Sequence, residues 1–415
     1  MSISRIIGSA ALGLTLMAAG AGGCSGDDDS TPTEHEHDVA GHGGAPDTGD
    51  TDLASQAADL RVNLNLLLSE HMDLAAKATG AALGGRSDEF KAYGALLNDN
   101  GNDIGALVGA AFGNAAKTQF NGIWSAHNGY FVDYTAAVAD KNADKQAQAV
   151  KDLTERFVPE FSKLISDATA LPQDDVKDLT MQHVLMTKAV VDAQAKHDWP
   201  ATYAAIREAT AHMAMIGTPL ASAIAKKFPN RFPGDSSTAA VDFRVALNQG
   251  LQEHMFLATF ATGAALGGRA DEFAAAGDAL NDNGTELGAV IGDLYGAEAR
   301  SSFNSVWSAH NGYFVAYTEG VAAKDEAKQA KAVDELTNDY VPDFAKLISG
   351  ATGLPMKAVS DLALHHVLAT KAVVDAQAAL DMTAAADADR EAGRHMQMIA
   401  DPLATAIVAK LPAKF

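Results

Sequence analysis

The sequence has little cysteine and little positive charge, and each shortage excludes a class of protein. Cys24 is the single cysteine in 415 residues, so an intrachain disulfide, a cysteine-based zinc site and an iron–sulfur cluster are all excluded. Only 31 Lys and Arg stand against 53 Asp and Glu, and the formal charge of −22 opposes binding to a phosphate backbone. We therefore expect no nucleic-acid partner.

Strand-forming runs are also scarce. The chain has 12 prolines, and we find no convincing alternation of apolar and polar residues of the kind that marks a strand. Alanine is abundant and 47 % of the residues are hydrophobic, which favours helices around a packed core. We predict an all-α fold made of two tandem copies of a roughly six-helix bundle domain.

An apolar run of the roughly 18–20 residues that a membrane-spanning helix needs is missing as well. A shorter run, residues 6–19, follows Arg5 and precedes the small residues 21–23 and Cys24. This order resembles a bacterial lipoprotein signal, in which the cysteine is lipidated. We expect residues 1–24 to be removed on export and the lipid on Cys24 to anchor the protein to a membrane of the cell envelope. An ordinary signal peptide with an incidental cysteine is the alternative.

Residues 25–52 are acidic, rich in Gly, Pro, Ser and Thr, and almost free of apolar side chains. This composition predicts a disordered tether between the membrane and the folded part. The histidines of the tether, His35, His37 and His42, could bind metal weakly, although a solvated linker with incidental histidines is the favoured interpretation.

An internal repeat organises the rest of the chain. The sequence matches itself without a gap at a shift of 183 residues, so that Trp124–Val132 and Trp307–Val315 are identical. More than half of the positions agree between 57–227 and 240–410. The predicted divisions are the first copy, 53–228, a linker, 229–239, and the second copy, 240–415.

Glycine and proline positions divide the first copy into six predicted helices. Asn98–Gly101 is a candidate break in the second, and Pro159 and Pro219 are expected to kink the fourth and the sixth. The expected helices cover about 53–83, 87–112, 115–139, 143–168, 173–196 and 201–227.

Four of these helices carry a histidine near the midpoint of their apolar face. Antiparallel neighbours have their midpoints at one level, so we expect the four imidazoles to meet in one layer of each copy. The sets are His71, His127, His183 and His212 in the first copy, and His254, His310, His366 and His395 in the second.

Buried imidazoles need partners for their ring nitrogens, and four rings in one layer satisfy one another only in part. A shared cation satisfies all of them, and imidazole is the commonest protein ligand of transition metals. We therefore predict one metal ion in each copy, held for storage, buffering or delivery. Histidines that are simply hydrogen-bonded in the core are the alternative.

Three further pairs of residues could support these sites. A glutamate four residues before the last histidine could be a ligand or a hydrogen-bond acceptor. A methionine three residues after it would favour copper over zinc or iron, unless it only fills the core. A tyrosine could hydrogen-bond a bound group or only pack. The pairs are Glu208 and Glu391, Met215 and Met398, and Tyr134 and Tyr317.

Four segments of the first copy, with their counterparts in the second, carry a resemblance to known proteins. They are 59–62, 68–71, 124–134 and 211–215, of which Trp124-x-x-His127-x-x-x-Phe131 is the most specific. They resemble a poorly characterised family of secreted bacterial helical-repeat proteins, often labelled by a fused copper amine oxidase N-terminal-type domain. This chain shows no sign of the fused domain or of a catalytic amine oxidase domain, so the resemblance implies no established activity.

Two other classes of function stay open on sequence grounds. One is a His-ligated iron or haem protein, acting as an oxygen or electron carrier or as an oxidoreductase. Covalent haem is excluded by the lack of a Cys-x-x-Cys-His motif, and a bridged di-iron centre is short of carboxylates. The other is a metal-free structural or adhesive surface domain. The sequence identifies no protein partner.

Overall fold

Helix boundaries follow local capping chemistry. In the computed structural model, which describes residues 52–415, α2 (Gln56–Leu83) begins after Ser55. The Ser55 side chain accepts a hydrogen bond from the backbone N–H of Ala58 at 3.2 Å and so satisfies one of the free donors of the first turn. The helix ends at a pair of glycines, and Gly85 takes a positive φ of 68°, which glycine adopts without strain.

The first copy of the repeat forms seven α-helices and one π-helical segment. A short 3₁₀ turn, η1 (Asp52–Ala54), precedes them. The elements are α2 (Gln56–Leu83), α3 (Ser87–Phe112), α4 (Asn114–Ala139), α5 (Ala143–Asp152), the π segment η2 (Leu153–Phe157), α6 (Val158–Thr169), α7 (Gln173–Ala195) and α8 (Trp199–Lys227).

The second copy repeats this order, and a 3₁₀ turn, η4 (Pro412–Lys414), follows it. No strand occurs between residues 52 and 415, so the all-α prediction is confirmed. The elements are α9 (Ala239–Leu266), α10 (Ala270–Tyr295), α11 (Ala297–Ala323), α12 (Glu326–Asp334), the π segment η3 (Glu335–Tyr340), α13 (Val341–Thr352), α14 (Met356–Ala378) and α15 (Met382–Lys410).

The expected break at Asn98–Gly101 is absent, because α3 runs through these residues without interruption. Asn100 is fully buried, and its side-chain amide donates to the Leu67 carbonyl of α2 at 2.8 Å. Gly101 lies directly under Trp124. Asn100 and Gly101 are typical turn residues in the sequence, but in the fold they mediate the packing of α3 on its neighbours.

The two expected proline kinks have different outcomes. The π segment η2 ends just before Pro159, which occupies the first turn of α6. Proline lacks the N–H of a regular helix and crowds the preceding turn, and a wider π turn accommodates it. By contrast, α8 continues through Pro219 as one helix.

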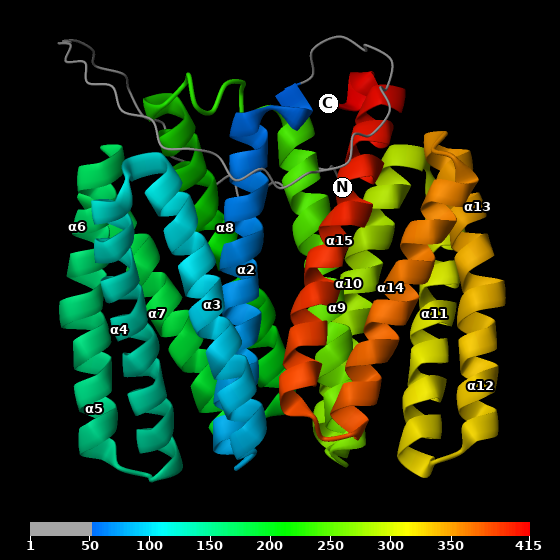
Figure 1. Ribbon diagram of the computed structural model, residues 1–415, viewed down its shortest axis with the longest axis horizontal. Coiled ribbons are helices and arrows are strands. Elements are labelled where there is room, and N and C mark those ends of the chain that lie inside the picture. Colours follow the sequence, from blue (N-terminus) through cyan, green and yellow to red (C-terminus); the bar gives the residue numbers. More distant parts are fainter. Residues whose placement is uncertain (1–51) are drawn as a thin grey trace.

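The two copies lie side by side and share a packed interface (Figure 1). Helix α2 packs on α9, α3 on α15 and α8 on α10, whereas α4–α6 and α11–α13 lie on the outer sides. Small apolar residues of α2 and α9 form one buried cluster across the interface: Ala58, Val62, Leu66, Val241 and Val245. The joined core fixes the two histidine-bearing bundles relative to each other.

A buried ion pair makes this interface asymmetric. Lys77 Nζ of α2 lies 2.7 Å from Asp389 Oδ2 of α15, and both side chains are almost wholly buried. The equivalent positions in the repeat are Phe260 and Ile206, so this ion pair has no counterpart with the copies exchanged. A buried pair of this kind favours one register of the two copies, since a misplaced charge would remain uncompensated.

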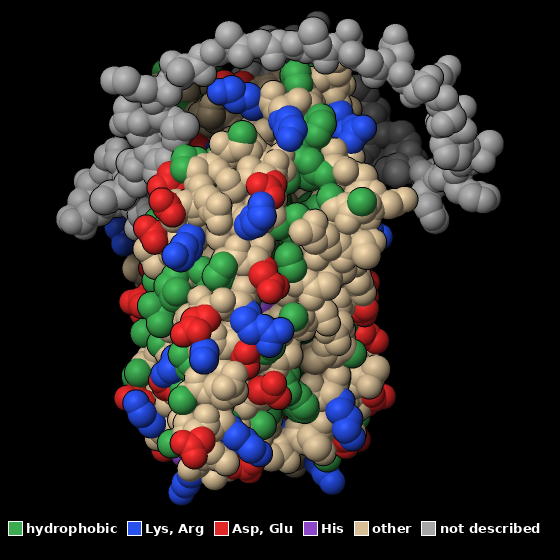
Figure 2. Space-filling model, turned by 90° about the vertical axis from the view of Figure 1, so that its left-hand side faces the viewer, with side chains coloured by type: hydrophobic (Ala, Val, Ile, Leu, Met, Phe, Trp, Pro, Cys, Tyr) green, Lys and Arg blue, Asp and Glu red, His purple; other side chains and the backbone are tan. Residues whose placement is uncertain are grey.

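The surface carries charges of both signs among apolar side chains on the face shown in Figure 2, with little histidine visible. Among residues 52–415, no helix combines the length and the apolarity needed to cross a bilayer. The predicted signal, Cys24 and nearly all of the predicted tether, including its three histidines, lie outside the described residues.

Candidate metal centre

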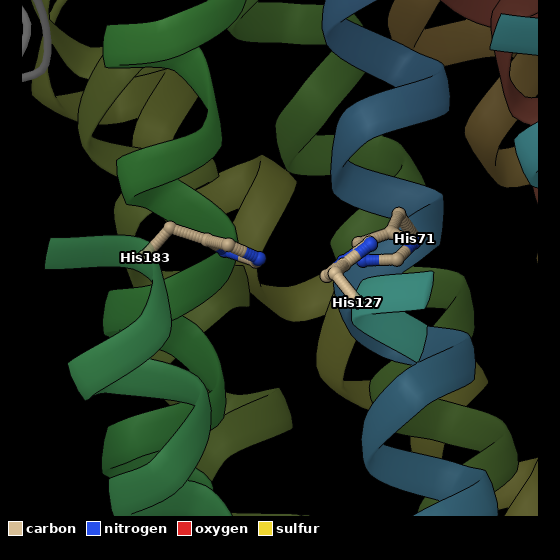
Figure 3. A group of neighbouring side chains, drawn as sticks. All are labelled: His71, His127 and His183. Carbon is tan, nitrogen blue, oxygen red and sulfur yellow. The ribbon is translucent and has the colours of Figure 1, made fainter. Parts of the chain in front are cut away.

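Three of the four predicted histidines converge in the core of each copy. Each lies on a different helix, and in each group the nitrogen atoms that could bind a metal all lie within 4.8 Å of one another. Figure 3 shows His183 reaching across from α7 toward His71 of α2 and His127 of α4. We call His71, His127 and His183 the first triad, and His254, His310 and His366 the second triad.

The two triads have nearly the same geometry. In the first, the ring centroids are 5.3, 5.9 and 6.0 Å apart. In the second, the corresponding distances are 5.2, 6.0 and 6.2 Å. The repeat therefore builds one arrangement twice, each time from the first, third and fifth of the predicted helices, and both triads are placed to bind a metal ion.

Burial keeps the triad imidazoles neutral. Their exposed fractions are between 0 and 4 %. Loss of hydration lowers the pKa of His127 to about 4 and that of His183 to about 3, and the pKa of His71 falls well below its ordinary value. A neutral ring carries a lone pair on one nitrogen, which is the form that binds a metal.

Backbone hydrogen bonds determine which nitrogen carries that lone pair. His127 Nδ1 lies 2.6 Å from the Trp124 carbonyl oxygen, and His310 Nδ1 lies 2.6 Å from the Trp307 carbonyl oxygen. A carbonyl oxygen only accepts, so Nδ1 is the protonated nitrogen and Nε2 presents its lone pair to the centre of the triad.

The spacing of these nitrogens suits a metal ion. His310 Nε2 and His254 Nε2 are 3.4 Å apart. Metal–nitrogen bonds of about 2.0–2.1 Å in trigonal or tetrahedral geometry separate the ligand nitrogens by about 3.3–3.6 Å. This edge of the second triad therefore already has the span that a shared ion requires.

Several triad nitrogens have no hydrogen-bond partner among the described residues. In the first triad these are Nδ1 of His71, Nε2 of His127 and both ring nitrogens of His183, and in the second they are Nδ1 of His254 and Nδ1 of His366. Buried polar atoms without a partner are costly and rare in folded proteins. Unpartnered ring nitrogens in a group of three close imidazoles, found in both copies, are an arrangement that a bound cation could complete.

An asparagine and a glutamate form a chain of polar contacts that ends at His71 of the first triad. Asn100 lies beside the His71 ring, where its side chain raises the pKa of His71 against the larger opposing effect of burial. The Asn100 amide is held in turn by Glu70 Oε2 at 2.7 Å. Arg390 of the second copy then holds Glu70 through two hydrogen bonds of 3.0 Å.

The second copy has the equivalent chain of polar contacts with the copies exchanged. Asn283 donates to Glu253 Oε2 at 2.7 Å, and Arg207 of the first copy donates to Glu253 at 2.9 and 3.3 Å. Sequence reasoning missed both chains, because Glu70 and Glu253 adjoin a histidine and so point away from its ring. One sequence signal could have revealed these chains: their Asn, Glu and Arg occupy equivalent positions in the two copies of the repeat.

Aromatic rings pack against the histidines of the triads and shield them from water. The Trp124 ring lies 4.7 Å from the His71 ring, and the Phe157 ring stacks on the His127 ring at 4.5 Å and 16°. In the second copy, Tyr340 stacks on His310 at 4.7 Å and 19°. Phe157 and Tyr340 are the last residues of the two π segments, so the π turns supply this wall.

The fourth predicted histidine of each copy lies outside the triad. His212 Nε2 donates to the Leu179 carbonyl at 2.9 Å, and His395 Nε2 donates to the Leu362 carbonyl at 3.2 Å. Leu179 lies one turn before His183 on α7. His212 of α8 therefore meets α7 one helical turn away from the level of the triad. The convergence therefore involves three rings, not four.

The other predicted site residues also lie away from the triads. Glu208 and Glu391 are exposed, Met215 is half-buried and Met398 is 57 % exposed. The tyrosine hydroxyls bond to aspartates instead: Tyr134 donates to Asp192 at 2.6 Å and Tyr317 donates to Asp375 at 2.5 Å.

The space beside the triads is small. A cavity of about 110 Å³ touches the three rings of the second triad, and one of about 40 Å³ touches His183 of the first. Pockets for larger organic ligands measure roughly 300–1,000 Å³. The described packing thus has room for an ion and a water molecule but not for haem.

Comparisons of the chain with protein-family models, with curated proteins and with solved structures gave no match.

Proposed function

We propose that each copy binds one transition-metal ion through its triad and that the protein stores, buffers or delivers this metal in the cell envelope. One observation carries the proposal: in each copy, three neutral, buried imidazoles from three helices bring one ring nitrogen each within 4.8 Å of the others, and ring nitrogens of both triads lack a hydrogen-bond partner among the described residues. Histidines kept only for packing would have hydrogen-bond partners of their own. This argues against the metal-free structural or adhesive alternative.

Copper is the favoured metal, ahead of zinc and iron. The groups that converge among the described residues are imidazoles alone, with no carboxylate to offset the charge of the ion. The desolvation cost of a buried ion grows with the square of its charge, so a monovalent ion suits a neutral, dry site better than a divalent one. Copper(I) is the monovalent member of the common imidazole-binding metals.

The location follows from the N-terminal sequence. The order of Arg5, the apolar residues 6–19 and Cys24 supports export and lipid attachment. The folded part would then lie at the membrane surface on its tether, in an oxidising compartment where free metal ions must be captured or passed on.

Elemental analysis of the chain from Ser25 onward tests the proposal. We expect about two metal ions per chain after incubation with copper(I), and about one in the His71→Ala/His127→Ala variant. The matched control is His197→Gln, since this surface histidine has no counterpart in the second copy, and it should keep both ions. A folded chain that takes up no copper, zinc or iron would overturn the proposal.

A further inference from the structure

A large cavity lies where the two copies of the repeat meet. Its volume is about 470 Å³, and residues of both copies line it, whereas no triad histidine does. Three pairs of lining residues occupy equivalent positions in the repeat: Gly80 and Gly263, Arg86 and Arg269, and Gln194 and Gln377. Small-molecule sites measure roughly 300–1,000 Å³ and occur preferentially at interfaces between domains. This interface cavity is therefore a candidate ligand site that is separate from the metal centres.

A repeated glycine–arginine motif brings one guanidinium group from each copy to the interface cavity. The sequence Gly-Gly-Arg follows α2 and α9 and ends at Arg86 and at Arg269, which both line the cavity. A Cβ atom at Gly84 would lie 2.1 Å from Arg86 Nη1, and one at Gly267 would lie 2.0 Å from Arg269 Nη1. The glycines thus leave the space in which each guanidinium lies against the end of its helix.

A glutamate three residues further on holds each guanidinium group and leaves some of its donors free. Arg86 Nε donates to Glu89 Oε2 at 2.7 Å, and Arg269 Nε donates to Glu272 Oε2 at 2.7 Å. Within the described part of the chain, Nη1 of Arg86 and both Nη atoms of Arg269 have no acceptor. A positioned guanidinium with free N–H groups matches the geometry of a carboxylate. The motif therefore favours an anionic ligand group.

The other charges that line the interface cavity also favour an anion over a cation. Its acidic side chains already have cationic partners: Asp88 pairs with Lys91, Glu89 with Arg86 and Glu272 with Arg269. The buried Lys77 is compensated by Asp389 at 2.7 Å. The exposed Lys324 also lines the cavity and has no carboxylate partner among the described residues. A cation would thus find no unpaired carboxylate in the lining, whereas an anion finds unused donors.

Aromatic side chains form the apolar side of the interface cavity. Trp199, Tyr203 and Phe260 line it, and the rings of Tyr203 and Phe260 pack edge to face with their centroids 5.6 Å apart. The equivalents of Trp199 and Tyr203 in the second copy are Met382 and Ala386, so the α8 side of the cavity is the more aromatic one. Aromatic rings offer a large apolar surface on which a flat ligand can stack.

We propose that the interface cavity binds a small aromatic carboxylate. Its ring packs against Trp199, Tyr203 and Phe260, and its carboxylate accepts hydrogen bonds from a guanidinium group of the Gly-Gly-Arg motif. Because both copies line the cavity, the bound ligand also stabilises their interface. This inference is independent of the proposed metal binding.

Isothermal titration of the full-length chain with cinnamate and with its neutral analogue cinnamamide tests this site. We expect one cinnamate per chain, bound about tenfold more tightly than cinnamamide, because hydrogen bonds to a charged acceptor are the stronger ones. Arg86→Gln/Arg269→Gln should abolish this preference, and Trp199→Leu should weaken the binding of both compounds. Arg156→Gln/Arg300→Gln is the matched control, since it removes two exposed arginines outside the cavity and should change neither affinity.

Two single-site chains check that the interface cavity is separate from the triads: His254→Ala/His310→Ala keeps the first triad, and His71→Ala/His127→Ala keeps the second. Both should bind cinnamate as the parent chain does, and loss of binding in both would overturn a separate site.

Three other results would also overturn the proposal: no binding of cinnamate, equal affinities for cinnamate and cinnamamide, or an unchanged preference in the Arg86→Gln/Arg269→Gln variant. Far-UV circular dichroism verifies the fold of each variant. Should the double variant be misfolded, the single variants Arg86→Gln and Arg269→Gln replace it, and at least one of them must lose the preference for cinnamate.

Discussion

At the scale of single residues, the properties of each triad follow from neutral rings held in one tautomer. His127 shows this most clearly, because the Trp124 carbonyl fixes its Nδ1–H and burial prevents a second proton from binding. The same two effects act on His310. The metal-binding atom is thus prepared by a backbone bond within one helix and by the apolar surroundings of that helix.

The lowered pKa values predict that the metal-free protein loses stability in acid. The pKa of His127 is about 4 in the folded chain and 6.5 in the unfolded chain. Between these values only the unfolded chain binds the proton, so this group does not affect the free energy of unfolding above about pH 6.5 and lowers it as the pH falls toward 4. The expected loss from His127 alone is about 3 kcal/mol, measured by urea unfolding across this range.

His127→Leu is the control for this pH dependence. Leucine removes the titrating group, so the variant should lose about 3 kcal/mol less between pH 6.5 and pH 4 than the parent chain. A free energy of unfolding that stays constant over this range would show that the triad rings remain open to solvent protons in the folded state.

At the scale of secondary structure, close helix contacts position the aromatic wall. A Cβ atom at Gly101 of α3 would lie 2.6 Å from Trp124 Cδ1, so the indole ring of α4 rests directly on the α3 backbone. The same indole ring lies 4.7 Å from the His71 ring. The apparent turn former in α3 therefore permits the approach of two helices that the site needs.

Gly101→Ala should destabilise the protein by about 1–3 kcal/mol, because the added methyl group overpacks the contact with Trp124. It should also lower the metal affinity of the first triad, since the indole ring would move toward His71. Urea unfolding and a copper titration measure the two effects. Gly94→Ala in the same helix is the control: nothing lies within 4 Å of its Cβ, and the change should leave stability equal or higher. Equal effects of the two substitutions would contradict the argument.

At the scale of the whole molecule, each copy holds a buried or half-buried glutamate of the other. Arg390 of α15 holds Glu70, which is 2 % exposed, and Arg207 of α8 holds Glu253. Through Asn100 the first of these ion pairs reaches the first triad. The duplication is therefore more than two independent bundles on one chain, because each copy supplies the arginine that orders its neighbour.

Arg390→Met should cost about 3–5 kcal/mol of stability, because the buried Glu70 carboxylate loses its two hydrogen bonds from Arg390 and keeps only the Asn100 amide and Arg394 at 3.7 Å. It should weaken copper binding at the first triad and leave the second triad unchanged, although Arg390 belongs to the second copy. Copper titration of the two single-site chains measures this. Adding Glu70→Gln removes the uncompensated charge and should restore most of the stability. A loss of affinity at the second triad instead would contradict the crossed support.

The helices and the identity of the candidate ligands could be predicted from the sequence, because both are local properties. Apolar spacing, capping residues such as Ser55 and the 183-residue match between copies predict where helices lie and which faces they bury. His71, His127 and His183 were found because each lies on such a face. Asn100 was misjudged because an isolated helix gives no sign that a buried amide is a packing residue.

Only the tertiary structure decided which rings meet. Helical periodicity gives the face on which a side chain lies but not the axial offset between helices, and an offset of one turn takes His212 to the Leu179 carbonyl instead of to the triad. The pairing of Glu70 with Arg390 joins residues 320 positions apart, so it depends on how the two copies dock. Offsets and docking result from the packing of the whole core, and no local pattern encodes them.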